Sequence, residues 1–273
     1  MPSTRNTAPK LTKRTVLITG GTSGIGLALA TRLVQRGNTV IVTGRDPARL
    51  AAATRDVPGV NTMLSDVSDP GAIAMLYARV ISEFPTLDVL VNNAGIMRNL
   101  DLNQTRALED VTRELDVDLS GPVRMVQQFL PHLAARPEAV IVNVSSGLAF
   151  VPYPLSPVYS AAKAGLHAYT RILRVQLAGT RVTVVELVPP ATETPLLRAL
   201  VAETAQKQKG MDVDELAVRA IVGIEAGRLE IRPGLSNVLR ILSRLAPGFA
   251  LRQLVKAVGP TPRQRLDVPS PAQ

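Results

Sequence analysis

Three side chains near the middle of the chain have the types and spacing that proton transfer requires. Ser146 follows an apolar run, Tyr159 comes thirteen residues later, and Lys163 follows Tyr159 by four. Residues at i and i+4 of a helix share one face, so the phenol and the ammonium are expected side by side. A nearby cation favours the charged phenolate. A Tyr-x-x-x-Lys pair alone is often a surface pair, but here it accompanies a strand-end serine and a glycine-rich turn.

That turn, TGGTSGIG at 19–26, directly follows the first apolar run and opens a helical segment. Its glycines permit a tight turn and close approach of the backbone to a phosphate, and the helix N-terminus offers free N–H groups to a pyrophosphate. The alternative is an ordinary strand–helix connection. The spacing differs from GxxxxGK[ST], which disfavours a P-loop nucleotide triphosphatase. The predicted dinucleotide-binding residues of this turn are Gly20, Thr22, Ser23, Gly24, Ile25 and Gly26.

The end of the second apolar run bears on which dinucleotide binds. NAD sites usually place an acidic residue there, on the ribose 2′-hydroxyl. This chain has Gly44 at that place and Arg45 next to it. A guanidinium can grip a 2′-phosphate with two hydrogen bonds, so we predict NADP(H) as the cofactor. In the alternative, Arg45 is a solvated residue at a helix start and Asp46 binds a ribose hydroxyl.

Hydrophobic periodicity indicates the elements that must position these residues. Short, nearly continuous apolar runs stand between longer segments of helical period, as expected for strands buried on both faces of a parallel sheet. The alternation predicts a doubly wound, Rossmann-type α/β fold with right-handed crossovers. Strands are expected at 15–19, 39–43, 60–64, 87–91, 139–144 and 181–188, and helices at 24–36, 47–54, 69–83, 105–134 and 156–178.

The chain is expected to form one catalytic domain with additions at both ends. The parts are a flexible arm (1–13), a Rossmann-type catalytic domain (14–234), and a basic amphipathic helical extension with a disordered tail (235–273). The last third departs from the alternation, with helices expected at 192–210, 212–226, 236–245 and 249–258, and a short edge strand at 229–231.

The extension is basic and amphipathic. Between 228 and 266 there are eight Lys or Arg residues and one acidic residue, Glu230. We interpret its apolar face as a packing surface against the body or another subunit, with a weak contact of 236–258 with an anionic membrane surface as the alternative. The apolar face collects Val238, Ile241, Leu242 and Leu245.

Composition excludes several classes of function. There is no cysteine, which removes disulfides and thiol chemistry, and two histidines leave little for a metal site, so none is expected. Aromatic residues make up 3%, and no nucleic-acid-binding module is recognised, so no nucleic-acid partner is expected. The N-terminal arm lacks an apolar leader pattern. The expected location is the cytoplasm, with the extension as a route to peripheral membrane contact.

Taken together, the motifs resemble those of the classical short-chain dehydrogenase/reductase family over about 14–230. The closest resemblance is to the branch of oxidoreductases associated with lipoteichoic-acid D-alanylation loci, through GLAFVPYPLSPVYSAAKAGLHA and LSRLAPGFALRQL. One family glycine is replaced by Pro190. The matching pieces are TGGTSGIG (19–26), Asp66-Val67, NNAG (92–95), the serine in NVSSG (143–147), YSAAK (159–163) and the segment from Pro189 to Thr194.

The resemblance implies a role for each matched residue. Tyr159 would be the general acid in reduction, Lys163 would lower the pKa of Tyr159 and bind the nicotinamide ribose, and Ser146 would hold the substrate oxygen. A homo-oligomer is also implied, through the helices 114–134 and 156–178. The other implied cofactor-binding residues are Asp66 and Val67 at the adenine, Asn93, Ala94 and Gly95 at the adenosine ribose, and Pro189 and Thr194 at the nicotinamide.

One residue departs from the family pattern. The family usually has an asparagine in V-N-x-x-G, supporting a water relay from the lysine, and Asp118 stands there in this chain. An ionised aspartate accepts hydrogen bonds but cannot donate them. Asp118 is interpreted as a tolerated isostere, and the alternatives are that it pairs with Lys163 and tunes Tyr159, or that the enzyme is degenerate.

The function predicted from these observations is an NADP(H)-dependent oxidoreductase that interconverts a carbonyl and a hydroxyl. The apolar loop 147–158 and the leucines Leu196, Leu197 and Leu200 favour an apolar small molecule as substrate. The alternative function is a dinucleotide-binding regulatory or scaffold protein with weak or no catalysis.

Overall fold

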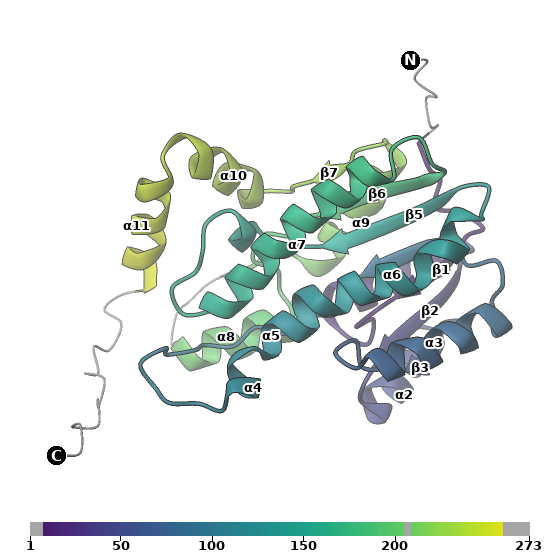
Figure 1. Cartoon of the computed structure of the whole chain (residues 1–273), viewed down its shortest axis with the longest axis horizontal. Helices are drawn as coiled ribbons and strands as arrows, with labels where there is room; N and C mark the ends of the chain where they lie inside the picture. The colour runs from purple at the N-terminus through teal and green to yellow at the C-terminus, as the bar shows by residue number, and fades with distance from the viewer. Residues whose placement is uncertain (1–7, 205–208, 259–273) are drawn as a thin grey trace.

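The computed structural model describes residues 8–204 and 209–258 and has a parallel seven-stranded sheet at its centre (Figure 1). The strand order is β3-β2-β1-β4-β5-β6-β7, so the winding direction reverses between β1 and β4. The predicted doubly wound sheet is confirmed, and each expected strand is present. The strands are β1 (Thr15–Ile18), β2 (Thr39–Gly44), β3 (Asn61–Leu64), β4 (Val89–Asn92), β5 (Ala139–Val144), β6 (Val182–Leu187) and β7 (Glu230–Ile231).

Helices cover both faces of the sheet. One face carries α1 (Gly24–Gln35) and α9 (Val213–Glu225), and the other carries α3 (Pro70–Glu83), α6 (Gly121–Ala134) and α7 (Pro157–Gln176). The remaining longer helices are α2 (Pro47–Asp56), α8 (Pro195–Thr204), α10 (Leu235–Leu245) and α11 (Pro247–Val258).

Two of these helices begin at the same local signal. Asp46-Pro47 opens α2 and Asp69-Pro70 opens α3. The Asp69 carboxylate accepts the Gly71 backbone N–H at 2.7 Å, while the proline lies where a helix needs no N–H donor. These caps fix where each helix starts after its strand.

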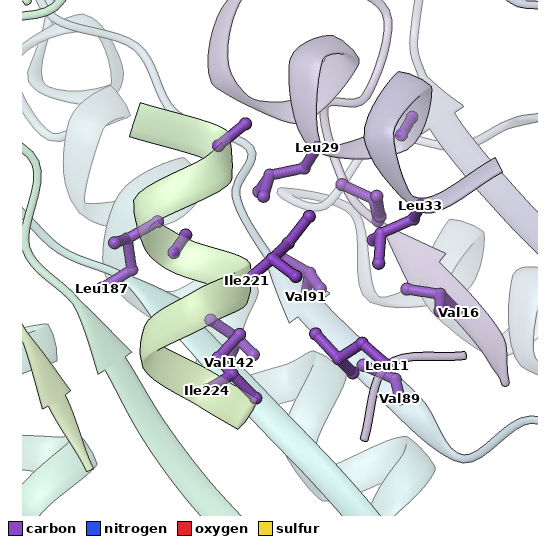
Figure 2. Packing of buried hydrophobic residues seen from close by; sticks show 14 of the residues in the cluster. Leu11, Val16, Leu29, Leu33, Val89, Val91, Val142, Leu187, Ile221 and Ile224 are labelled. Carbon is purple, nitrogen blue, oxygen red and sulfur yellow. The ribbon is translucent and has the colours of Figure 1, made fainter. Parts of the chain in front are cut away.

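The core on the first face lies between α1, α9 and the sheet. Figure 2 shows Ile221 of α9 close to Leu29 of α1 and Val91 of β4, and Ile224 of α9 close to Val142 of β5. Leu11, within the expected arm, is buried in the same cluster, and its backbone N–H donates to the Glu225 carboxylate at 2.9 Å. Leu11, in the part of the arm that the structure describes, therefore packs against the body.

The single helix expected at 105–134 is wrong. The structure has α4 (Leu108–Val111), α5 (Arg113–Leu115), a π-helical turn (Asp116–Ser120), and then α6. Pro122 has no N–H to donate to the carbonyl of residue 118, so a regular α-helical pattern is interrupted there. The Gly121 N–H instead donates to the Asp116 carbonyl, one residue further back than in an α-helix.

The two expected C-terminal helices are present as α10 and α11, which project from one end of the molecule (Figure 1). Ser236 is buried, but Val238, Ile241 and Leu245 are exposed. The body therefore does not cover these three side chains, so packing against the body is wrong for them, and packing against another subunit stays a prediction. The expected disordered tail lies outside the described residues. Over the described ranges, no helix combines the length and apolarity needed to cross a membrane.

Candidate active site

A cavity of about 500 Å³ lies beside the carboxyl ends of β1, β2, β4, β5 and β6. The expected catalytic and cofactor-binding residues line it, except Gly26, which is buried behind the turn. They are Gly20, Thr22, Ser23, Gly24, Ile25, Arg45, Asp66, Val67, Asn93, Ala94, Gly95, Asp118, Ser146, Tyr159, Lys163, Pro189 and Thr194.

The glycine-rich turn has a backbone conformation that residues with a Cβ could not adopt without strain or a clash. Gly20 and Gly24 have φ of +64° and +53°, a region that favours glycine. A Cβ on Gly20 would lie 2.7 Å from the Ala94 Cα, and one on Gly26 would lie 2.4 Å from the Asn93 Nδ2. The Asn93 side-chain amide donates to the carbonyls of Thr19 and Gly20, both at 3.0 Å. Asn93 therefore holds the turn in place.

The end of the cavity beyond this turn is lined by Arg45 and Arg49, and each of these arginines lies within 4 Å of an aspartate carboxylate, Asp66 and Asp46 respectively. Half of the Arg45 side chain is exposed, and its guanidinium is 3.9 Å from the Asp66 carboxylate. The Asp46 carboxylate accepts the backbone N–H groups of Ala48 and Arg49, at 2.9 and 3.3 Å, and so caps α2. Arg49 also lines the cavity, a placement that sequence reasoning missed although Arg49 follows Arg45 by about one helical turn.

Asp66 is held ionised on the cavity wall. The Ser68 backbone N–H and hydroxyl donate to the same carboxylate oxygen, at 2.9 and 2.7 Å. Burial alone would raise the pKa of Asp66, but these hydrogen bonds, with the nearby Arg45, leave that pKa below its ordinary value. Asp66 can therefore accept hydrogen bonds at neutral pH.

Ser146, Tyr159 and Lys163 lie together at the other part of the cavity. Ser146 follows β5, and the other two share one face of α7. Ser146 neighbours the Tyr159 phenol and, against the effect of burial, acts to lower the pKa of that phenol, and the Lys163 Nζ is 5.6 Å from the centre of the Tyr159 ring. The Lys163 ammonium also donates to the Val144 carbonyl at 3.1 Å. All three side chains are largely buried, so the phenol can exchange a proton within a site of limited solvent access.

Asp118 forms a buried ion pair with Lys163. One oxygen of its carboxylate lies 3.0 Å from the Lys163 Nζ, and the other accepts the Ile96 N–H at 3.1 Å. The π-helical turn carries Asp118, and Gly95 leaves room for it, since a Cβ on Gly95 would lie 2.6 Å from the carboxylate. The geometry therefore matches the pairing alternative for Asp118.

Burial and this ion pair act together on the ionisation of the site. Burial raises the pKa of Asp118 to about 6, although Lys163 and the Ile96 N–H oppose the rise. Burial also raises the pKa of Tyr159, an effect that Lys163 opposes and Asp118 adds to. The Lys163 pKa is raised because its two partners outweigh burial. The protein side chains thus keep Tyr159 protonated, as a general acid must be.

The remaining wall of the cavity is apolar. Leu196, Leu197 and Leu200 of α8 line it, as expected, and the Thr194 hydroxyl accepts the Leu197 N–H at 3.2 Å to start that helix. Sequence reasoning missed leucines from the extension, although Leu235 and Leu239 are one turn apart on α10. The added lining residues are Leu235, Leu239 and Leu254, with Leu148 and Tyr153 from the predicted apolar loop.

A parallel sheet with a glycine-rich first turn and a Ser-Tyr-Lys site at its carboxyl edge defines a Rossmann-fold oxidoreductase. The chain belongs to the short chain dehydrogenase family, whose model matches residues 14–205. The family resemblance predicted from the motifs is confirmed.

Known relatives and structures agree with this assignment. The chain is 42% identical to the uncharacterized oxidoreductase DltE of Bacillus subtilis over 223 residues, 81% of this chain and 88% of that one. This similarity confirms the predicted resemblance to the oxidoreductases associated with D-alanylation loci. The chain is also 34% identical to the NADP-dependent 3-hydroxy acid dehydrogenase YdfG of Escherichia coli K12 over 175 residues, covering 64% and 71%. A Burkholderia phymatum short chain dehydrogenase/reductase in complex with NAD shares the fold, with a TM-score of 0.78, 21% identity, and coverage of 86% and 95%.

Proposed function

We propose that this protein is an NADP(H)-dependent oxidoreductase that interconverts a carbonyl and a hydroxyl on an apolar small molecule. The observation that carries the proposal is the position of Ser146, Tyr159 and Lys163 on one cavity whose far end holds Arg45 and Arg49. The proposed proton donor, Tyr159, and the proposed phosphate-binding arginines therefore line the same cavity.

In the direction of reduction, a bound NADPH would supply the hydride that the carbonyl carbon needs, and the protein must deliver one proton to the carbonyl oxygen. Tyr159 donates that proton, and the Ser146 hydroxyl positions the oxygen beside the phenol. The Lys163 ammonium stabilises the phenolate left behind until a proton from water restores the phenol. As the family resemblance implies, Lys163 would also hold the nicotinamide ribose, and Pro189 and Thr194, which line the same cavity, would hold the nicotinamide.

The turn and the two arginines beyond it fit a dinucleotide with a 2′-phosphate. Gly20 and Gly24 leave a cradle that a Cβ would fill, and the N-terminus of α1 follows it. Gly44 places no carboxylate at the end of β2, and Asp46 is engaged as the cap of α2, while the Asp66 carboxylate lies 3.9 Å from the Arg45 guanidinium. These features support NADP(H), as does the name of the YdfG relative.

A second candidate is a dinucleotide-binding regulatory protein with weak catalysis. The observation that favours it is the Asp118–Lys163 ion pair, because the carboxylate opposes the charge that stabilises the phenolate. The intact Ser146 and Tyr159 favour the enzyme.

We further propose a homo-oligomer, formed through the helices within 114–134 and 156–178. Ile172 and Val175 are exposed on α7, which supports an apolar surface there. For location we propose the cytoplasm, with peripheral contact between 236–258 and an anionic membrane surface.

Two measurements test the proposed function. Consumption of NADPH with a panel of aldehydes and ketones separates an enzyme from a binding protein, and no turnover with any of them favours the regulatory candidate. Titration with NADPH and NADH tests the cofactor. A charge-assisted hydrogen bond contributes about 1.5 kcal/mol at its lower limit, so Arg45→Ala should reduce the preference for NADPH roughly tenfold. Arg55→Ala, at the far end of α2, is the matched control and should leave the preference unchanged.

A further inference from the structure

The helices α10 and α11 form a hairpin whose inner side belongs to the substrate cavity. Leu235 and Leu239 of α10 and Leu254 of α11 line the cavity. Leu239 lies directly against Gly147, where an added Cβ would be 3.1 Å from its Cδ1. Because Gly147 directly follows Ser146, Leu239 of the hairpin lies close to the proposed catalytic serine.

Polar contacts hold this inner side in place. The Arg240 guanidinium is 3.2 Å from the Glu230 carboxylate and 5.4 Å from the centre of the Phe150 ring. Ser236 is fully buried at the start of α10. The hairpin is therefore anchored to β7 and to the loop after Ser146, and its inner leucines keep their places at the cavity.

The hairpin also carries exposed apolar side chains that do not line the cavity. Its exposed apolar residues range from 39% exposed at Leu251 to 80% at Leu245, and the cavity-lining Leu235 is itself 57% exposed. Single exposed apolar residues are ordinary, but a group of this size on two consecutive helices is typical of an interaction surface. We call this group the outer face; it comprises Val238, Ile241, Leu245, Phe249, Leu251 and Val255.

Charge indicates what covers the outer face. The hairpin has no acidic residue between 235 and 258, and besides Arg240, which pairs with Glu230, it contains the cations Arg244, Arg252 and Lys256. A second copy of the same face would bring like charges together, which is unfavourable. An anionic lipid surface instead accepts both the apolar side chains and the cations beside them.

The substrate end of the cavity is matched to an uncharged, apolar molecule. The charged residues that line the described cavity are either at the end with Arg45 and Arg49 or in the buried Asp118–Lys163 pair. The wall between α8 and the hairpin is made of leucines, including Leu197, Leu200 and Leu239. Leu235 connects this wall to the outer face, because it lines the cavity and is also exposed.

We propose that the α10–α11 hairpin docks on an anionic membrane and that the substrate is a long-chain lipid carbonyl taken from that membrane past Leu235. The substrate part rests on the proposed NADP(H)-dependent function, and the reaction is the hydride and proton transfer written above. The docking part is inferred from the exposed apolar residues of the outer face and from the cations of the same two helices.

Vesicle flotation tests the docking without any reaction. The protein should float with vesicles of phosphatidylcholine and phosphatidylglycerol at low salt, and much less with phosphatidylcholine alone or at high salt. Removing two cations, in Arg244→Gln with Lys256→Gln, should weaken binding roughly thirtyfold. Leu245→Ser should also weaken it, whereas Leu108→Ser, equally exposed on α4, should not. No flotation of the wild type at low salt would overturn the docking, as would a Leu245→Ser protein that floats normally but changes from dimer to monomer on sedimentation.

Turnover with two probes tests the substrate class. Hexadecanal carried in the anionic vesicles should be reduced faster by the wild type than by Leu245→Ser, while soluble butanal should be reduced equally by both. Equal rates on vesicle-borne hexadecanal would overturn the lipid-substrate part. If neither aldehyde is reduced but flotation is as expected, the docking stands and it is the proposed oxidoreductase function that has failed.

Discussion

Replacing Asp118 with asparagine separates the charge of this residue from its shape. The buried carboxylate lies 3.0 Å from the Lys163 Nζ, which is 5.6 Å from the centre of the Tyr159 ring, so the carboxylate lies within 8.6 Å of that centre. At an effective dielectric constant of about 20, a unit charge at that distance opposes a phenolate by about 2 kcal/mol. Asp118→Asn removes this opposition and keeps a side chain of the same size.

The expected result is a shift in the pH dependence of carbonyl reduction. The energy of about 2 kcal/mol corresponds to roughly a 25-fold change in favour of the phenolate. Since Asp118 contributes to the raised pKa of Tyr159, its removal lowers that pKa. Reduction requires the protonated phenol, so the basic limb of the pH–rate profile should move to lower pH.

The assay is NADPH oxidation across a pH series, in wild type and Asp118→Asn. Asp116→Asn is the matched control, because Asp116 lies in the same π-helical turn but is not paired with Lys163. Its profile should coincide with that of the wild type. If Asp118→Asn leaves the basic limb where it was, the ion pair does not tune Tyr159 and Asp118 is the tolerated isostere.

Three further substitutions test how the site is supported. Gly95→Ala places a Cβ 2.6 Å from the Asp118 carboxylate, so turnover should fall, as NADPH oxidation with a carbonyl that the wild type reduces would show. Gly26→Ala places a Cβ 2.4 Å from the Asn93 Nδ2 and should cost about 1–3 kcal/mol of stability in urea unfolding, together with weaker NADPH binding. The imidazole of His167 lies 2.8 Å from the buried Glu186 carboxylate, which also accepts the Ser145 hydroxyl at 2.6 Å. His167→Ala removes the first partner and should lower the free energy of unfolding by about 1–3 kcal/mol. An unchanged urea midpoint would contradict this role.

The sheet could be predicted because its signals are local. Buried parallel strands are short apolar runs, and the helices between them have their own period and caps, as at Asp46-Pro47. The helix at 105–134 could not be predicted well, because its apolar spacing continues across Pro122 while its backbone hydrogen bonds do not. A proline one turn after Asp118 was the available warning.

The site could be predicted only where its residues belong to contiguous motifs. Asp118 and Lys163 belong to different helical segments, and the strength of their interaction depends on burial. Spacing along the chain therefore could not distinguish an isostere from a residue that pairs with Lys163. The same holds for the extension. Leu239 and Leu254 reach the cavity because the hairpin folds back beside Gly147, a placement that the helical pattern alone does not determine.

Replacing Tyr159 with phenylalanine tests the central claim most directly, because the substitution removes the phenolic hydroxyl and little else. NADPH oxidation by the Tyr159→Phe protein should be measured with a carbonyl that the wild type reduces, alongside NADPH titration of both proteins. The account predicts loss of nearly all turnover with cofactor binding close to that of the wild type. Near-normal turnover by Tyr159→Phe would contradict the mechanism.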